Sequence, residues 1–264
     1  HAFHAGVLQA LERELGLDAR DATLVVGTSA GAQVAALIRA GMSAADLGAR
    51  VRGRPLSPEG REIAKHYVRP SHELPPRSER PPWRPGSLRY LSAVVRRPWR
   101  VRPGRLVSAL VPDGQIGRAS CRERVWWVVG SAPSTDVGTA VAASGAVPGV
   151  CRSVVIGGRR FVDGGIASAA HLDLCAASEE DVIFVSNPLS IFPPLRLLLR
   201  REVRALRPAD KTVVLFEPSA DAASVMGLDV MDVERAPPTV EAAREAATKA
   251  LRSRKLRRLV GSLF

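Results

Sequence analysis

The sequence contains few cysteines and no long apolar run. Its 264 residues include three cysteines, Cys121, Cys151 and Cys175. An odd number without C-x-x-C spacing predicts neither a disulfide framework nor a zinc site, so we expect no metal and no cofactor. No stretch of about 18 uninterrupted apolar residues is present to span a bilayer. We therefore expect a cytoplasmic protein, with peripheral contact to a membrane as an open alternative.

Lysine is scarce, and arginine supplies almost all of the positive charge. Of 38 basic residues against 26 acidic ones, which give a net charge of +12, four are lysines. A basic field attracts nucleic acids and anionic membranes. However, a compositional bias toward arginine, alanine, valine and glycine explains the charge equally well. No nucleic-acid recognition module and no interleaving of aromatic with basic residues is present, so we expect no nucleic-acid partner.

The length and composition fit one globular domain over residues 1–264. Apolar residues make up 46% of the chain and charged residues 24%, which are ordinary values. The chain begins with His1 rather than Met, and we expect its natural N-terminal segment to be missing.

Proline concentrates in one part of the chain. Residues 52–115 contain 11 of the 20 prolines. Proline interrupts helix interiors and central strands, so we expect an irregular, Pro- and Arg-rich insertion over residues 52–124, with one short helix near 87–95. Such a segment is typical of a lid over a site, or of a linker, and both readings stay open. Residues 115–124 fit neither a helical nor a strand pattern.

Elsewhere, helical and strand patterns alternate, which predicts an α/β fold with a largely parallel sheet. Gly157-Gly158 is a two-residue hairpin signal. The predicted strands are 23–26, 125–129, 154–156, 160–162, 182–185 and 212–216. The predicted helices are 7–15 (ending at Gly16), 29–40, 137–146, 195–206 and 240–259.

One motif between a predicted strand and a predicted helix indicates nucleophilic chemistry. Gly27-Thr28-Ser29-Ala30-Gly31 has the G-x-S-x-G pattern of a nucleophile elbow, in the strand–turn–helix context that this motif requires. Glycines are needed because the strand and the helix approach closely at so tight a turn. The helix N-terminus favours developing negative charge. A phosphate-binding turn, or a turn that only packs, is the alternative.

A serine hydroxyl needs a neighbouring base to accept its proton. His171 would complete the Ser…Asp…His order of α/β-hydrolases, but that fold places several strands before its elbow, and 28 residues cannot supply them. The remaining histidines are His1, His4, His66 and His72, which lie at the start of the chain or in the insertion. We expect all five to be surface or structural residues.

Asp163 is the better candidate for the base. In Phe161-Val162-Asp163-Gly164-Gly165, a predicted strand delivers the aspartate directly into a double glycine. Gly164 and Gly165 let the backbone turn sharply, which leaves the carboxylate at a sheet edge. A D-G-G triplet alone is a weak signal, but its pairing with an elbow in the correct context strengthens it.

Three motifs in order resemble the patatin-like phospholipase family. They are the elbow at 27–31, Ala142-Ala143-Ser144-Gly145-Ala146-Val147-Pro148-Gly149, and the segment 156–165 that ends in Asp163-Gly164-Gly165. The resemblance extends over most of residues 4–51 and 125–190. It implies a three-layer α/β/α sandwich with a mostly parallel central sheet, and a Ser29–Asp163 dyad that hydrolyses acyl esters of lipids without histidine. An inactive protein of this fold that binds lipid or membrane is the alternative.

The resemblance also implies a glycine-rich loop before the first helix, whose amides stabilise the oxyanion. The chain starts where that loop would have ended, so we expect the missing loop to limit activity. Asp163 also has to be a stronger base than a free aspartate, whose pKa is about 3.9. Burial or a short hydrogen bond has to supply the difference.

The predicted helix 195–206 mixes leucines with arginines. Its apolar residues can lie in a membrane interface while Arg196, Arg200, Arg201 and Arg204 reach anionic head groups. The alternative is a helix that packs on the sheet with a solvated arginine face. Both interpretations remain open.

Overall fold

A computed structural model of the chain describes residues 1–66, 115–116, 119–122, 125–128, 135–147, 151, 153–176, 178–229, 232–254 and 256–257. These residues form two compact units. The first combines His1–Val25, Val34–Val68 and Leu172–Phe264, and the second combines Val26–Gln33 and Arg69–His171. The expectation of a single domain stays a prediction, and the helix expected near 87–95 lies outside the described residues.

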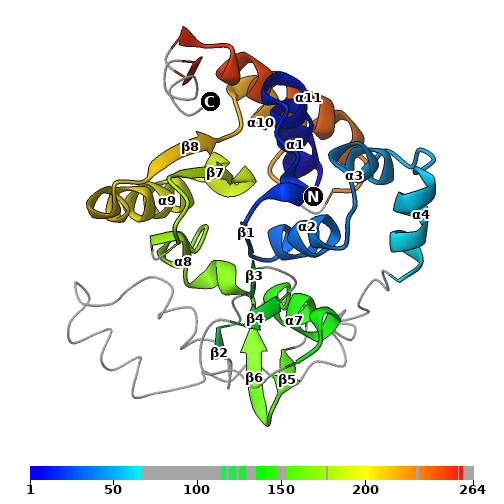
Figure 1. Cartoon of the computed structure of the whole chain (residues 1–264), viewed down its shortest axis with the longest axis vertical. Coiled ribbons are helices and arrows are strands. Elements are labelled where there is room, and N and C mark those ends of the chain that lie inside the picture. Colours follow the sequence, from blue (N-terminus) through cyan, green and yellow to red (C-terminus); the bar gives the residue numbers. More distant parts are fainter. Residues whose placement is uncertain are drawn as a thin grey trace. The chain divides into compact units, whose positions relative to one another are not determined.

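The core of the first unit lies where helix α1 (Ala2–Leu15) packs against helix α11 (Ala236–Leu251), as Figure 1 shows. Gly16 ends α1 with a φ of 68°, which confirms the predicted helix end. Helix α11 begins four residues before its predicted start, because two prolines fit the first turn of a helix. The buried side chains of this core are Phe3, Val7, Ala10, Leu11, Val214, Phe216, Met226, Ala243, Ala247 and Leu251.

The same unit contains a parallel strand pair. Strands β7 (Val182–Ser186) and β8 (Thr212–Phe216) pair in register from Val182–Thr212 to Ser186–Phe216. Helix α9 (Pro193–Ala205) lies in the connection between them, as a parallel pair requires a long crossover. The predicted strands and the predicted helix are confirmed, and α9 starts two residues early at a proline.

Three helices of this unit begin at serine N-caps that the sequence patterns did not identify. They are α3 (Ala44–Val51), α4 (Pro58–Lys65) and α10 (Ala220–Met226). Each cap hydroxyl accepts the amide three residues on, which satisfies one unpaired donor of the first turn. The prediction of irregular backbone from residue 52 onward is wrong for Pro58–Lys65, which form helix α4. Its proline occupies the first helical position, where a missing N–H is no loss.

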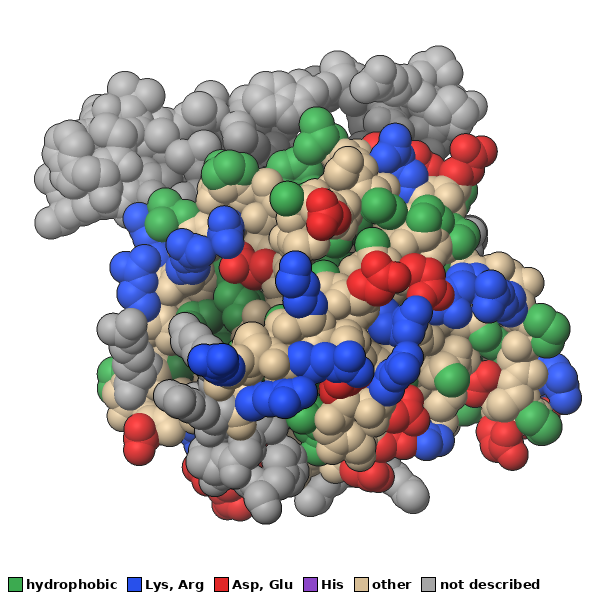
Figure 2. Space-filling view, turned by 90° about the horizontal axis from the view of Figure 1, so that it is seen from above, with side chains coloured by type: hydrophobic (Ala, Val, Ile, Leu, Met, Phe, Trp, Pro, Cys, Tyr) green, Lys and Arg blue, Asp and Glu red, His purple; other side chains and the backbone are tan. Residues whose placement is uncertain are grey.

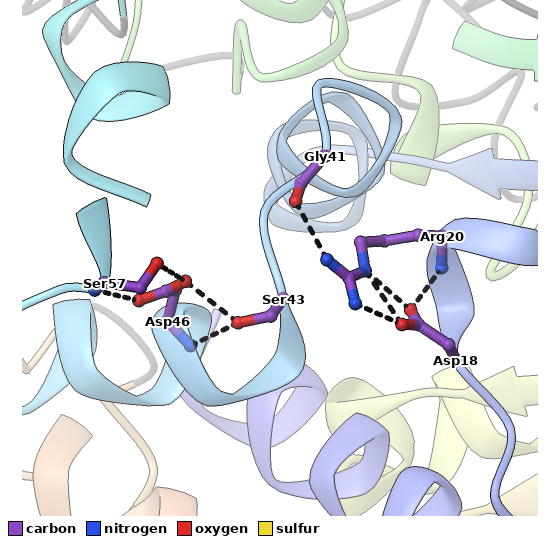
Figure 3. Close-up of polar contacts among 6 residues, drawn as sticks. All are labelled: Asp18, Arg20, Gly41, Ser43, Asp46 and Ser57. Atoms are coloured by element: carbon purple, nitrogen blue, oxygen red, sulfur yellow. Dashed lines mark hydrogen bonds and ion pairs between the residues drawn. The ribbon is translucent and has the colours of Figure 1, made fainter. Parts of the chain in front are cut away.

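A buried carboxylate joins the first turns of α3 and α4 (Figure 3). The oxygens of Asp46 accept hydrogen bonds from the Ser43 hydroxyl at 2.9 Å, and from the amide and hydroxyl of Ser57 at 2.7 Å each. Burial by itself raises the pKa of Asp46. The hydrogen bonds from Ser57 and Ser43 outweigh that effect, so the pKa lies below its ordinary value of 3.8.

The remaining strands form two small sheets, in the orders β1-β3-β4 and β2-β6-β5. Strand β2 runs parallel to β6, and β3 runs antiparallel to β4. Strands β2 and β3 lie within residues 115–124, where the sequence pattern predicted no element. The bounds are β1 (Leu24–Gly27), β2 (Gln115–Ile116), β3 (Ala119–Arg122), β4 (Val125–Val128), β5 (Val154–Ile156) and β6 (Arg159–Val162).

Strands β5 and β6 form the predicted hairpin. Gly157 and Gly158 connect them with φ values of 55° and 75°, the pair of positive angles that a tight two-residue turn requires. Helix α7 (Val137–Ser144) packs on this hairpin, where Ala143 contacts buried side chains of β5 and β6.

The described chain is thus mixed α/β, with small sheets that include parallel pairs. The α/β class is confirmed, and the three-layer sandwich stays a prediction. Over the described ranges, no helix has both the length and the apolar character needed to cross a membrane.

The Asp46 contacts predict a pH-dependent contribution to stability. Asp46→Asn should lower the free energy of unfolding by about 1–2 kcal/mol at pH 7, because an amide accepts fewer of these hydrogen bonds. The pKa of Asp46 is depressed in the fold, so its contribution is present above the unfolded value of 3.8 and is lost as the pH falls through the folded value. Urea unfolding between pH 3 and pH 7 measures the difference.

The exposed Glu59 in the first turn of α4 provides the matched control. Glu59→Gln should change the free energy of unfolding by less than about 0.5 kcal/mol. Equal effects of the two substitutions at pH 7 would contradict the role assigned to Asp46.

Candidate active site

Ser29 lies at a strained turn between strand β1 and helix α2 (Ala30–Arg39), in the second unit. Its φ angle is 55°, which is uncommon for a residue other than glycine. At Gly27, a Cβ atom would lie 2.3 Å from the Gly31 carbonyl oxygen. The strand and the helix therefore approach too closely for a side chain at Gly27. This is the backbone arrangement expected of a nucleophile elbow.

Asp163 follows β6 directly and begins the short turn Gly164–Ile166. Its side chain is buried, with 4% of the residue exposed. One carboxylate oxygen accepts the Gly165 amide at 2.7 Å. Burial raises the pKa of Asp163 above its ordinary value of 3.8, although hydrogen bonds from Ser29 and Gly165 act in the opposite direction.

The fold brings Ser29 and Asp163 together from positions 134 residues apart (163 − 29). The two side chains lie close enough for a hydrogen bond from Ser29 to lower the pKa of the Asp163 carboxyl. Thr28 lies beside the same turn, since its Cγ2 atom is 3.9 Å from a Cβ atom placed on Gly165. The arrangement provides a hydroxyl, and beside it a buried carboxylate that is a stronger base than a free aspartate.

Ser144, to which no sequence pattern assigns a role, also contacts this turn. The Ser29 amide donates to the Ser144 hydroxyl oxygen at 3.1 Å. Two residues later, the Ala146 carbonyl oxygen accepts the Asp163 amide at 3.0 Å. Ser144 lies in the motif 142–149, which resembles the patatin-like family, but no local pattern reveals a hydrogen bond between residues so distant in sequence.

His171 lies near the D-G-G turn, and its Nε2 atom contacts the backbone of that turn. The residue is 1% exposed, and its Nε2 atom lies 3.1 Å from the Gly164 carbonyl oxygen. A carbonyl oxygen only accepts, so Nε2 carries the proton and donates. His171 thereby stabilises the turn that carries Asp163.

In the first unit, His4 hydrogen-bonds through Nδ1 to the Ser186 hydroxyl at 2.9 Å. Burial lowers the pKa of His4 to about 3, so the ring is neutral. A structural role for His4 and His171 agrees with these contacts. Exposed His66 lies beside Glu62 of α4, at 3.8 Å.

Other potentially reactive groups among the described residues do not form a second catalytic or metal-binding arrangement. Burial raises the pKa of the Cys175 thiol to about 11, which keeps it protonated and unreactive at neutral pH. Within the described ranges, no group of three or more His, Cys, Asp or Glu side chains is placed to hold a metal ion.

Many arginines of the first unit lie beside carboxylates. Arg20 binds the Asp18 carboxylate and lies 3.5 Å from the Gly41 carbonyl oxygen (Figure 3). On the face drawn in Figure 2, acidic side chains lie among the basic ones. This mixture does not form a surface of one sign. Further ion pairs are Arg52–Glu241, Arg196–Glu217, Arg235–Asp232, Arg244–Glu241 and Arg252–Glu14.

Comparison with models of known protein families finds no match for this chain, and comparison with curated proteins finds none. The elbow at Ser29 and the D-G-G turn at Asp163 therefore carry the functional proposal.

The close approach at Gly27 predicts that a single added methyl group strongly lowers the stability of the fold. Gly27→Ala should lower the free energy of unfolding by roughly 3 kcal/mol, because the new Cβ atom would overlap the Gly31 carbonyl group. Chemical denaturation of both proteins measures the change.

Gly145→Ala is the control, because a Cβ atom there would lie at an ordinary 3.5 Å from the Val141 carbonyl oxygen. It should change the free energy of unfolding by less than about 1 kcal/mol. A Gly27→Ala protein as stable as this control would contradict the close approach of β1 and α2.

Proposed function

We propose that the protein is a serine acyl hydrolase that cleaves carboxylic esters of lipids, with Ser29 as nucleophile and Asp163 as base. One observation carries the proposal. The serine occupies a strained strand–helix turn, and its hydroxyl meets a buried carboxylate whose pKa is raised. The patatin-like three-layer α/β/α sandwich belongs to the same proposal, supported by the mixed α/β fold and the three motifs that resemble that family.

The proposed reaction has two steps. Asp163 accepts the hydroxyl proton as Ser29 Oγ bonds to the ester carbonyl carbon. The bond to the leaving oxygen breaks, the proton passes to the departing alcohol, and an acyl-enzyme remains. Water then attacks the acyl carbon while Asp163 accepts its proton. The fatty acid leaves, and the proton returns to Ser29.

Burial of Asp163 supports its role as the base. Proton transfer is most effective when the pKa of the base approaches the working pH. Burial moves the pKa of Asp163 in that direction. The base function is lost when the pH falls through the raised pKa, because the carboxylate is then protonated.

The helix that follows the nucleophile can help to stabilise the oxyanion. In an elbow of this kind, the amide after the nucleophile is one oxyanion donor, and here it belongs to Ala30. The N-terminal end of α2 adds a favourable dipole.

Contact with an anionic membrane is proposed through the outer face of α9. Leu199 and Leu206 are buried, so they pack inward and add nothing to such a face. Leu197 is 48% exposed, and the exposed arginines around it are Arg196, Arg200, Arg201 and Arg204. Arg196 is paired with Glu217. The available apolar area is smaller than the leucine content indicates, so attraction between arginines and head groups has to supply most of the binding.

The dyad predicts a specific pattern of activity. Ser29→Ala and Asp163→Asn should each lower kcat for a p-nitrophenyl fatty-acid ester by about 10⁴-fold or more, because each removes a group that acts in the bond-making step. A fluorophosphonate probe should label the wild-type protein at Ser29, as mass spectrometry of the peptide would show.

His171→Gln is the matched control. Its amide can still donate to the Gly164 carbonyl oxygen, so this variant should keep most of the wild-type kcat. A folded but inactive His171→Gln protein would favour a catalytic triad. Failure of the wild-type protein to hydrolyse esters or to react with the probe would favour the lipid-binding alternative.

The α9 surface predicts binding to anionic vesicles at low salt. Arg200→Glu with Arg204→Glu should weaken sedimentation with phosphatidylserine vesicles by about 30-fold or more, since each arginine contributes about 1 kcal/mol. Arg13→Glu with Arg61→Glu changes the net charge equally at exposed positions on α1 and α4, and should have a smaller effect. Equal recovery of wild-type and Arg200/Arg204 variant proteins in the supernatant would contradict membrane contact through α9.

A further inference from the structure

Ser144 is a buried hydroxyl that the proposed reaction does not use. It is the last residue of helix α7 and is 1% exposed. Its oxygen accepts the Ser29 amide at 3.1 Å, across 115 residues of sequence. This contact involves the backbone of the nucleophile rather than its hydroxyl.

The amide of Ser29 needs an acceptor because of the turn itself. The contact is partly buried, and an N–H shielded from water is destabilising when it has no acceptor. A positive φ at a residue other than glycine is strained and persists only where its surroundings hold it. The Ser144 hydroxyl satisfies the amide in the conformation with a φ of 55° and thereby favours that conformation.

The same end of α7 also contacts the backbone of the base. The Ala146 carbonyl oxygen accepts the Asp163 amide at 3.0 Å. Ala143 anchors α7 by packing against Ile156 and Phe161 of the β5–β6 hairpin. The segment 144–146 therefore joins the nucleophile turn to the base turn, with one hydrogen bond to each.

We propose that Ser144 is a positioning residue, which holds the Ser29 backbone so that the hydroxyl stays directed at Asp163. This inference rests on the proposed function. Without the Ser144 hydroxyl, the Ser29 peptide unit can rotate, and the reacting oxygen moves away from the carboxylate. A displacement of about 1 Å at a reacting group can cost about 100-fold in rate.

The test compares Ser144→Ala with Ser144→Thr and Ser190→Ala. Ser144→Thr retains a hydroxyl acceptor. Ser190→Ala is the matched control, because Ser190 is also buried and donates to the Asn187 carbonyl oxygen in the first unit. Two quantities are measured on each folded protein: hydrogen exchange of the Ser29 amide, and kcat and KM for a p-nitrophenyl fatty-acid ester.

Ser144→Ala should speed exchange of the Ser29 amide by about 10-fold or more, and lower kcat by about 10- to 100-fold with KM unchanged. Ser144→Thr should restore both quantities to within about 5-fold of wild type, and Ser190→Ala should change neither. If Ser144→Ala does not fold, Ser144→Cys takes its place, because sulfur is only a weak acceptor.

Unchanged exchange in Ser144→Ala would overturn the hydrogen bond whether or not the protein is an enzyme. Faster exchange with an unchanged kcat would overturn the positioning role alone. If the wild-type protein hydrolyses no ester, the proposed function fails and the catalytic role of Ser144 fails with it. The exchange rates then show only whether Ser144 holds the turn.

Discussion

The close approach of strand β1 to helix α2 is the constraint on which the candidate site depends. A Cβ atom at Gly27 would lie 2.3 Å from the Gly31 carbonyl oxygen, so the chain reverses within a very short turn. That turn forces Ser29 to a φ of 55°. The Ser29 side chain then lies beside Asp163. The Ser29 amide donates to the Ser144 hydroxyl at the end of α7 instead of to a neighbouring strand.

Two aspartates with little exposed surface show opposite balances between burial and hydrogen bonding. Asp46 and Asp163 are 6% and 4% exposed. Three donor groups from two serines hold the pKa of Asp46 down, so its ionised form stabilises the fold above pH 3.8. At Asp163 the effect of burial exceeds that of the hydrogen bonds from Ser29 and Gly165, so its pKa is raised. Ionised Asp163 therefore opposes folding at neutral pH, and the strength of the base comes at a cost in stability.

Local sequence was sufficient for the parts of the site that depend on local geometry. The elbow at Ser29 and the turn at Asp163 have glycine patterns that a tight backbone requires, and apolar spacing located most strands and helices within a few residues. Helix α4 was missed because the surrounding prolines indicated irregular chain, although Ser57 and Pro58 form a helix start. Ser144 was assigned no role, because its partner lies 115 residues away and only the folded chain brings them together.

The distance along the chain between the two reacting groups has a consequence during synthesis. A ribosome that adds about 5–20 residues per second needs roughly 7–27 s to pass from Ser29 to Asp163. During that interval the nascent chain presents a serine hydroxyl with neither its carboxylate nor the helix end that orients its backbone. Under the proposed function, the emerging protein could not yet attack the esters of a nearby bilayer, and reactivity would begin only when the later segment has been made and has folded against the earlier one.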